Sequence, residues 1–504
     1  MELFQNLAMG FNVALTPINI IFCLVGCFIG TLIGVLPGIG PAGTLALLLP
    51  VTMGLPPTTA IIMLAGIYYG SMYGGSTTSI LVNLPGEAAS AITCLDGYQM
   101  ALQGRAGPAL GIAAFGSFIA GTVGVIFLML IAPPAAKFAL RFGPPEILAT
   151  MLFGLTIVGY LSSGSLVKAF ISATLGLFFG TIGTDIFGFH RFTFDIHDLY
   201  DGVGLVPLLI GLFGIAEVLL NLEQVITLRI SEKKIKGILP NREDWKLSAK
   251  PIVRGSLLGI LLGLVPGPSN TICSFVSYAV EKRISKYPER FGKGAIEGVA
   301  GPESANNAAC ASNCVPVFTL GIPTSPVMAL LMGAIIMHGI MPGPFLIKKN
   351  PDLFWGLVAS MYIGNVMLLV INLPFIWLWV KVLKVPYGIL FPLILMFCLL
   401  GTYANNSSLF DMNVMVFFGV VGYLMKKMRF EPAPLVMAYV LGPFLEEAFS
   451  QSLIMSYGDI FIFLKRPIPA ITLSLAFLFI VSNTFAGLKK RRKLLIEKLQ
   501  TEES

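Results

Sequence analysis

Charged residues are absent from long stretches of this chain. No Asp, Glu, Lys or Arg occurs in residues 3–86, 106–136, 304–347, 353–380 or 385–410. Each of these intervals is at least as long as the roughly 20 residues that a helix needs to span a bilayer. Only 12% of the 504 residues are charged and 56% are hydrophobic, whereas about 25% of the residues in a soluble protein are charged. The sequence therefore excludes a soluble globule and predicts a polytopic membrane protein.

The apolar intervals are continuous, whereas the strands of a membrane β-barrel alternate apolar and polar residues over about 10 positions. We therefore expect an all-α fold. The net charge of +7 lies in loop clusters, as is typical of cytoplasmic loops, so no nucleic-acid partner is expected. No basic residue precedes the first apolar run, so we do not expect a cleaved signal peptide.

The charge clusters predict the topology and the domain organisation. Residues 228–254 carry eight Lys or Arg against three acids, residues 281–293 carry five against two, and the tail from Lys489 opens with KKRRK. The positive-inside rule places all three in the cytoplasm, and the four Asp of residues 185–201 suggest the opposite face. We predict an N-terminal transmembrane repeat (1–227), a basic cytoplasmic linker (228–254), and a C-terminal transmembrane repeat with extra helices and a basic cytoplasmic tail (255–504).

Two apolar segments are broken by Pro and Gly. Residues 255–280 are uncharged but interrupted at Pro266-Gly267-Pro268, which leaves arms of about a dozen residues, too short to cross the bilayer. Because basic residues flank both ends, we expect a re-entrant hairpin. Residues 37–41 interrupt the first half in the same way. Irregular backbone at membrane depth must be buried in protein or line a wet cavity.

A second pair of breaks follows the first. When Pro85 is aligned with Pro323, Asn83-Leu84-Pro85-Gly86 matches Gly321-Ile322-Pro323-Thr324. Interrupted segments at corresponding positions of two halves are typical of the binding sites of secondary transporters. We therefore predict two repeated halves with re-entrant hairpins and broken helices. Only the second hairpin has basic flanks, which favours inverted repeats.

Small polar side chains cluster in the broken segments, which contain Ser, Thr and Asn but neither Lys nor Arg. Helix N-termini with Ser or Thr hydroxyls suit an anion, and unwound carbonyls with Asn oxygens suit a cation. The alternative interpretation is that small residues only allow close helix packing.

Several single residues have two interpretations. Glu303 could bind a proton or cation, or lie at the interface, and His338 could relay protons or simply be hydrogen-bonded. Glu87, Asp96 and Arg105 could form an interfacial site or end helices at the membrane surface. Residues 405–408 could line a pathway or form a loop. The seven cysteines lack nearby ligands for a metal and are expected to pack between helices.

Enzymatic functions lack their motifs. The sequence contains no H-E-x-x-H, no G-x-S-x-G and no G-x-x-x-x-G-K-[ST]. We expect no enzyme and no cofactor other than a coupling ion. A gated channel or passive pore built from the same re-entrant elements remains an alternative to a transporter, and a membrane-embedded enzyme is a weaker one.

Four segments, GVLPGIGP, YYGSMYGGSTTSILVNLPGE, FGKGAIEGVAGPESANNA and LGIPTS, resemble the large membrane subunit of tripartite tricarboxylate transporters, the TctA family. The resemblance covers about residues 15–480. It implies an elevator-type secondary transporter of the bacterial inner membrane that imports citrate or other carboxylates on an ion gradient of Na⁺ or H⁺. It also implies a periplasmic solute-binding protein and a small membrane subunit of the TctB type as partners, and a homo-oligomer is possible.

The resemblance transfers site residues by position. It places the two Pro-Gly signatures on Pro37, Gly38, Gly40 and Pro41 and on Pro266 and Gly267, and an acidic-Asn signature on Glu303, Asn306 and Asn307. Two departures lie at the expected site: no Gly follows two positions after Gly267, and Thr324 stands where Gly is common. The resemblance therefore implies a carboxylate without identifying it as citrate.

The candidate substrate-binding residues are Pro37, Gly38, Ser76, Thr77, Thr78, Asn83, Pro266, Gly267, Asn313, Thr324 and Ser325. The candidate coupling-ion residues are Gly40, Asn270, Glu303, Asn306 and Asn307.

Overall fold

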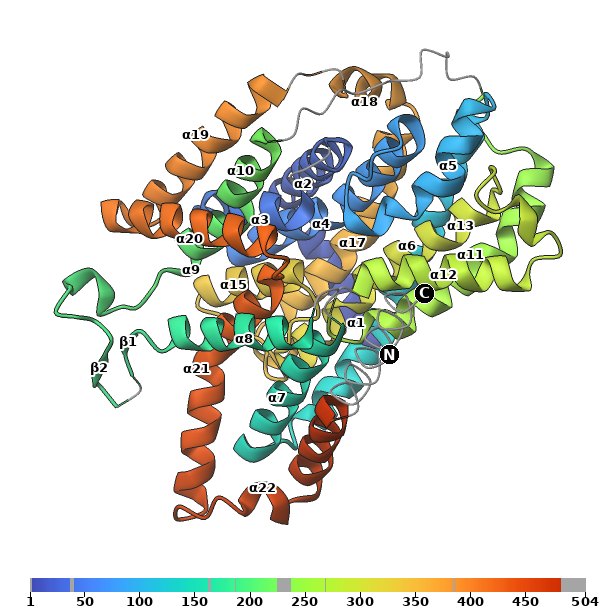
Figure 1. Cartoon of the computed structure of the whole chain (residues 1–504). Helices are drawn as coiled ribbons and strands as arrows, with labels where there is room; N and C mark the ends of the chain where they lie inside the picture. The colour runs from blue at the N-terminus through green and yellow to red at the C-terminus, as the bar shows by residue number, and fades with distance from the viewer. Residues whose placement is uncertain are drawn as a thin grey trace, which may run out of the picture. The chain divides into compact units, whose positions relative to one another are not determined.

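A computed structural model describes residues 2–36, 40–161, 165–185, 187–223, 237–267, 269–383, 385 and 387–481 (Figure 1). The predicted site residues Pro37 and Gly38, residues 228–236 of the predicted linker and the basic tail lie outside these residues. The chain forms two compact units: unit 1 comprises residues 1–140 and 203–428, and unit 2 comprises residues 141–202 and 429–504. Each unit draws on both halves of the chain.

Every secondary-structure element in the described residues of unit 1 is a helix. Its first part contains α1 (Glu2–Ala14), α2 (Pro17–Val35), α3 (Gly40–Thr52), α4 (Pro57–Val82), η1 (Ala88–Ala91), α5 (Thr93–Leu102) and α6 (Ala106–Ala139). A continuous span follows, formed by α9 (Leu205–Leu209), the π-helical η3 (Ile210–Ile215) and α10 (Ala216–Leu222). The remaining elements are α11 (Arg242–Gly263), α12 (Ser269–Ile284), η4 (Pro288–Arg290), α13 (Glu297–Ser312), α14 (Cys314–Leu320), α15 (Pro326–Met337), α16 (Leu346–Lys349), α17 (Pro351–Asn372), α18 (Ile376–Val382), α19 (Tyr387–Asn406) and α20 (Leu409–Lys427).

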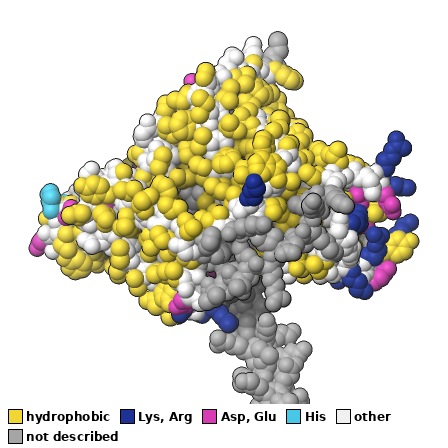
Figure 2. Space-filling model, turned by 90° about the horizontal axis from the view of Figure 1, so that it is seen from above, with side chains coloured by type: hydrophobic (Ala, Val, Ile, Leu, Met, Phe, Trp, Pro, Cys, Tyr) yellow, Lys and Arg dark blue, Asp and Glu magenta, His cyan; other side chains and the backbone are white. Residues whose placement is uncertain are grey.

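Within the described residues, six helical segments are long and apolar enough to cross a membrane. They are Pro17–Val35, Ala106–Ala139, Leu205–Leu222, Pro351–Asn372, Gly388–Asn406 and Leu409–Lys427. Large apolar side chains such as Leu261, Val370 and Phe417 are more than half exposed, which lipid accepts as solvent but water does not. Figure 2 shows hydrophobic side chains over most of the face in view, with most of the Lys and Arg side chains on one side of it. The prediction of an all-α polytopic membrane protein is confirmed.

Glycines bring two helix pairs of unit 1 into close contact. A Cβ added to Gly26, Gly30 or Gly34 of α2 would lie within 2.4 Å of a carbonyl oxygen of α4. In α11, a Cβ on Gly255 or Gly259 would lie within 2.3 Å of a carbonyl oxygen of α13. Small residues at every fourth position allow helix backbones to approach this closely in a membrane. The close packing of α2 on α4 and of α11 on α13 thus depends on residues without side chains.

Two of the predicted breaks share one backbone pattern. Helix α4 ends at Asn83, with φ 59°, and α14 ends at Gly321, with φ 68°, both in the left-handed region. A short irregular segment follows each end. Glu87 then caps η1 by accepting from the Ala89 N–H, and Ser325 caps α15 by accepting from the Met328 N–H. Left-handed C-caps and polar N-caps satisfy backbone groups that helix ends leave unpaired.

Helix α11 begins inside the segment predicted as a cytoplasmic linker. Asn241 caps it by accepting from the Asp244 N–H at 2.8 Å, and the Asp244 carboxylate accepts in return from the Asn241 N–H at 3.2 Å. This reciprocal cap starts the helix at Arg242. The first arm of the second hairpin is therefore 22 residues long, longer than the dozen predicted, because a charged first half precedes its apolar half.

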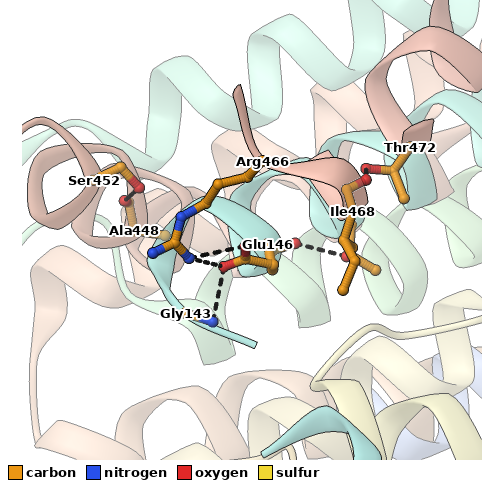
Figure 3. Close-up of polar contacts among 8 residues, drawn as sticks. Gly143, Glu146, Ala448, Ser452, Arg466, Ile468 and Thr472 are labelled. Carbon is orange, nitrogen blue, oxygen red and sulfur yellow. Dashed lines mark hydrogen bonds and ion pairs between the residues drawn. The ribbon is translucent and has the colours of Figure 1, made fainter. Parts of the chain in front are cut away.

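Unit 2 contains α7 (Pro144–Leu161), α8 (Leu166–Gly180), β1 (Gly183–Thr184), β2 (His190–Arg191), η2 (His197–Leu199), α21 (Pro432–Met455) and α22 (Ile462–Lys465), followed by a helix at 467–481. Arg466 Nη1 donates to both Glu146 carboxylate oxygens at 2.9 Å, and the Gly143 N–H donates to one of them (Figure 3). In the antiparallel β1–β2 segment, the backbone N–H groups of Phe189 and Phe187 lower the pKa of Asp185.

Candidate substrate cavity and polar network

A cavity of about 430 Å³ in unit 1 lies where helices restart after the chain breaks. Its wall includes the first residues of α3, α12 and α15 and the start of η1. The lining residues are Gly40, Pro41, Ala42, Gly43, Tyr68, Met72, Pro85, Gly86, Glu87, Ala88, Phe213, Glu217, Asn270, Thr271, Ser325, Pro326, Val327 and Lys426. Since helix N-termini carry partial positive charge and free N–H groups, this wall suits an anion.

A chain of buried polar side chains connects three of the lining residues, Tyr68, Asn270 and Glu87. Tyr68 OH and Asn313 Nδ2 both donate to Asn270 Oδ1 at 2.8 Å. Asn270 Nδ2 donates to Asn306 Oδ1 at 3.0 Å, and Asn306 Nδ2 donates to Glu87 Oε1 at 3.3 Å. The network thereby connects α4, α12, α13 and the break before η1. A connected network of this kind fixes the orientation of each amide.

The backbone behind the cavity is fixed by bonds between two breaks. The Gly267 N–H donates to the Thr324 carbonyl oxygen at 2.8 Å, and the Thr324 hydroxyl donates to the Asn313 carbonyl oxygen at 3.2 Å. Gly267 has φ 138°, which a residue with a Cβ rarely adopts. These contacts hold the start of α12 beside the start of α15.

Glu303 lies in a second polar cluster, on α13. Its carboxylate accepts from the Ser76 and Thr93 hydroxyls, both at 2.5 Å, and the residue is 1% exposed. One turn later, Asn307 Nδ2 donates to Ser117 Oγ on α6 at 2.7 Å. Glu303 is therefore held inside the helix packing by two hydroxyl donors.

Charged side chains reach the cavity from helices that the sequence did not link to the site. Lys426 of α20 forms an ion pair with Glu217 of α10, and both line the cavity. Glu87 is 8% exposed and lines it as well. Phe213 joins the wall from the π-helical η3, a type of segment that often occurs at functional sites.

The predicted site residues fall into three groups. Gly40, Asn270 and Ser325 line the cavity, and Gly267, Asn306, Asn313 and Thr324 are bonded directly behind its wall. Ser76, Thr77, Glu303 and Asn307 belong to the second cluster around α4, α6 and α13. Thr78 donates to the Val35 carbonyl oxygen, Asn83 is an exposed helix end, and Pro266 does not line the cavity.

Sequence reasoning did not assign Tyr68, Glu217, Thr271 or Lys426 to a site, and it considered Glu87 only for a possible interfacial site. Glu87 carried a usable signal, because it directly follows the Asn83–Gly86 break. Thr271 also lies within three residues of a recognised break, at Pro268. Lys426 and Glu217 carried no such signal in the sequence, since only the packing of α10 and α20 brings them to the cavity.

The other singled-out residues lie elsewhere. Asp96 accepts from three backbone N–H groups of residues 292–295, Arg105 pairs with Asp244, and His338 ends α15. Of residues 405–408, the first two end α19 and the last two connect it to α20. The seven cysteines are buried and unpaired, and the described residues contain no cluster of three or more His, Cys, Asp or Glu that could hold a metal.

Comparison with known proteins identifies the family. A 52.8 kDa uncharacterized protein in the TAR-I ttuC' 3' region of Agrobacterium vitis is 49% identical over 499 residues, which cover 99% of both chains. An uncharacterized protein in the TAR-II ttuC' 3' region of the same organism is 48% identical over 234 residues, 46% of this chain and 97% of that protein. No solved structure matches. Residues 20–437 match the family model for the tripartite tricarboxylate transporter TctA family, and the chain therefore belongs to that family.

Proposed function

We propose that this chain is the large transmembrane subunit of an ion-gradient-driven importer of carboxylates that depends on a periplasmic solute-binding protein. Membership of a transporter family, rather than an enzyme family, supports transport. The other expected partner is a small membrane subunit, and the expected location is the bacterial inner membrane with the C-terminus in the cytoplasm.

One observation carries the proposal: three helix N-termini, those of α3, α12 and α15, meet at a cavity that Lys426 also lines. Backbone N–H groups and a lysine ammonium are donors without acceptor capacity at those atoms, so they bind carboxylate oxygens. Half-helix N-termini at discontinuous membrane helices are also how secondary transporters hold anionic groups. The cavity therefore favours a small carboxylate over an amine or a sugar.

The charges of the wall favour coupling to a cation. Each helix N-terminus contributes about half a positive charge. Lys426 and Glu217 neutralise each other as an ion pair. The three N-termini then supply about one and a half positive charges, less than the negative charge of two carboxylates. A bound dicarboxylate therefore needs a cation or proton beside it, as in a symporter.

The packing also supports the proposal of two repeated halves. The register that aligns Pro37 with Pro266 pairs Gly26, Gly30 and Gly34 with Gly255, Gly259 and Gly263. The register that aligns Pro85 with Pro323 pairs the α4 residues that these glycines contact, Met63, Ile67 and Ser71, with Gly301, Ala305 and Ala309 of α13. It also aligns the left-handed Asn83 with Gly321 and the N-cap Glu87 with Ser325. Such a duplicated scaffold suits the elevator-type movement implied by the family.

Reconstitution tests the proposal against a passive pore. The chain, its small subunit and its binding protein are placed in liposomes, and uptake of labelled di- and tricarboxylates is measured with and without Na⁺ and proton gradients. We expect accumulation above the external concentration only with a gradient. Equilibration that is unaffected by collapsing both gradients would favour a channel and contradict the importer.

A further inference from the structure

A second, much smaller cavity lies between α4, α6 and α17. Its volume is about 10 Å³, and its polar lining consists of Tyr73, Ser76, Thr77, Ser117 and Asn372, with Leu and Ala side chains completing the wall. A space of this size holds one water molecule or one bare ion. It is too small for a carboxylate or a hydrated cation.

Asn372 presents an unsatisfied acceptor beside this cavity. Its Nδ2 donates to the Leu368 carbonyl oxygen at 2.9 Å and to Thr31 Oγ1 at 3.5 Å. Its Oδ1 is buried and accepts no hydrogen bond from any residue that the structure describes. Because both amide protons have acceptors, the unpaired atom is the oxygen. A buried oxygen without a donor is destabilising unless a ligand satisfies it.

Two hydroxyls of the lining direct their protons to other residues. Tyr73 OH donates to Asn365 Oδ1 at 2.9 Å, and Ser76 Oγ donates to Glu303 Oε2 at 2.5 Å. Ser117 Oγ accepts from Asn307 Nδ2 at 2.7 Å. The lining thus offers oxygen lone pairs, which are the groups that a hard cation such as Na⁺ binds.

The nearest carboxylate lacks a basic partner. Glu303 contacts the lining residue Ser76, is 1% exposed, and takes part in none of the ion pairs among the described residues. A buried ionised carboxylate is costly unless a positive charge lies close to it. A cation in the small cavity would be separated from the Glu303 carboxylate by the Ser76 hydroxyl.

We propose that the small cavity binds one dehydrated Na⁺, held by Asn372 Oδ1 and the Thr77, Ser76 and Ser117 hydroxyls and balancing the charge of Glu303. The assignment of this ion as the coupling ion rests on the proposed transport function. The ion and the substrate then bind in different cavities. Ser76 and Thr77, which the sequence predicted to bind substrate, belong to the ion site.

Thermal stabilisation of the purified subunit in detergent, without carboxylate, tests the site independently of transport. The melting temperature is measured in NaCl, KCl and choline chloride at equal ionic strength. We expect a rise that is specific to NaCl, because a ligand that binds only the folded state stabilises it. An equal effect of the three salts would mean that the cavity holds only water, and would overturn the proposal.

Matched variants locate the ion. Asn372→Leu, Thr77→Val and Glu303→Gln should each raise the NaCl concentration for half-maximal stabilisation by roughly tenfold or more, the factor expected when one ligand group is lost. Ser360→Ala, on the same helix as Asn372, and Thr78→Val, next to Thr77, should keep the NaCl effect even if their melting temperatures fall in every salt. Retention of the effect in Asn372→Leu and Thr77→Val would overturn the placement. A Na⁺-specific effect without carboxylate transport would refute the proposed function and leave the ion site intact.

Discussion

Two adjacent lysines at the end of α20 have different environments. Lys426 lines the large cavity and pairs with Glu217, whereas Lys427 pairs with Glu223 at 2.8 Å on the exposed surface. Loss of a hydrogen bond to a charged group costs about 1.5–3 kcal/mol, or roughly 10- to 150-fold in affinity. We therefore expect Lys426→Met to raise the half-saturation concentration for carboxylate uptake by that factor. Lys427→Met should transport like the parent; equal defects in both variants would contradict a role for Lys426 in substrate binding.

Asp96 should contribute to stability rather than transport. Its Oδ1 accepts from the N–H groups of Gly292, Gly294 and Ala295, each at 2.8 Å, and its Oδ2 accepts from Tyr278 OH at 2.9 Å. Asp96→Ala leaves these donors without an acceptor, at a cost of about 1–3 kcal/mol for a buried group. We expect a clearly lower melting temperature in detergent, while exposed Glu289→Ala should change it little. An unchanged melting temperature for Asp96→Ala would show that water replaces the carboxylate.

At the scale of single residues, the sequence predicted the site residues near breaks better than the site residues that helix packing brings to the cavity. Asn270 and Ser325 were found because each lies within two residues of a Pro-Gly or Pro-Thr break. Thr77 and Asn307 lie beside such segments, yet their side chains face α6 rather than the large cavity. The face of a helix on which a small polar residue lies depends on neighbours that a single sequence does not reveal.

The glycines of α2 and α11 lead to a prediction about how these helices pack. A Cβ on Gly30 would lie 2.4 Å from the Ile67 carbonyl oxygen, and one on Gly259 would lie 2.2 Å from the Ala305 carbonyl oxygen. Gly30→Ala and Gly259→Ala must push the helices apart, and overpacking typically costs about 1–3 kcal/mol. We expect both to lower the melting temperature by similar amounts. Gly54→Ala, with open space around it, is the control, and a tolerated Gly259→Ala would argue against equivalent helix pairs.

The breaks between elements were predictable because Pro and Gly interrupt apolar runs there. The start of α11 was not, since its first residues carry the charges that also mark a cytoplasmic loop. A capping box at Asn241 and Asp244 was present in the sequence but was outweighed by the basic residues around it. Charge indicates the side of the membrane more directly than it indicates whether a segment is helical.

At the scale of the whole molecule, the charge clusters predict the orientation in the membrane. Positions 197 and 242 are exposed and lie in an acidic loop and at the start of the basic α11, respectively. With single cysteines in a Cys-free background, an impermeant thiol reagent applied to intact spheroplasts should modify position 197 and spare position 242. The reverse labelling pattern would contradict this orientation.

The central claim is that substrate carboxylates bind in the large cavity. Ala88 lines it and is exposed, whereas Tyr287 is 57% exposed and is not among its lining residues. All seven native cysteines are buried, so a thiol reagent reacts mainly with a cysteine introduced as Ala88→Cys or Tyr287→Cys. The most direct measurement is the rate at which a thiol reagent labels each position. It is compared in the presence of a transported di- or tricarboxylate and in the presence of its uncharged amide. We predict that the carboxylate, but not the amide, slows labelling at position 88. Labelling at position 287 should be unaffected by either compound. Unchanged labelling at position 88 at saturating carboxylate would contradict the site.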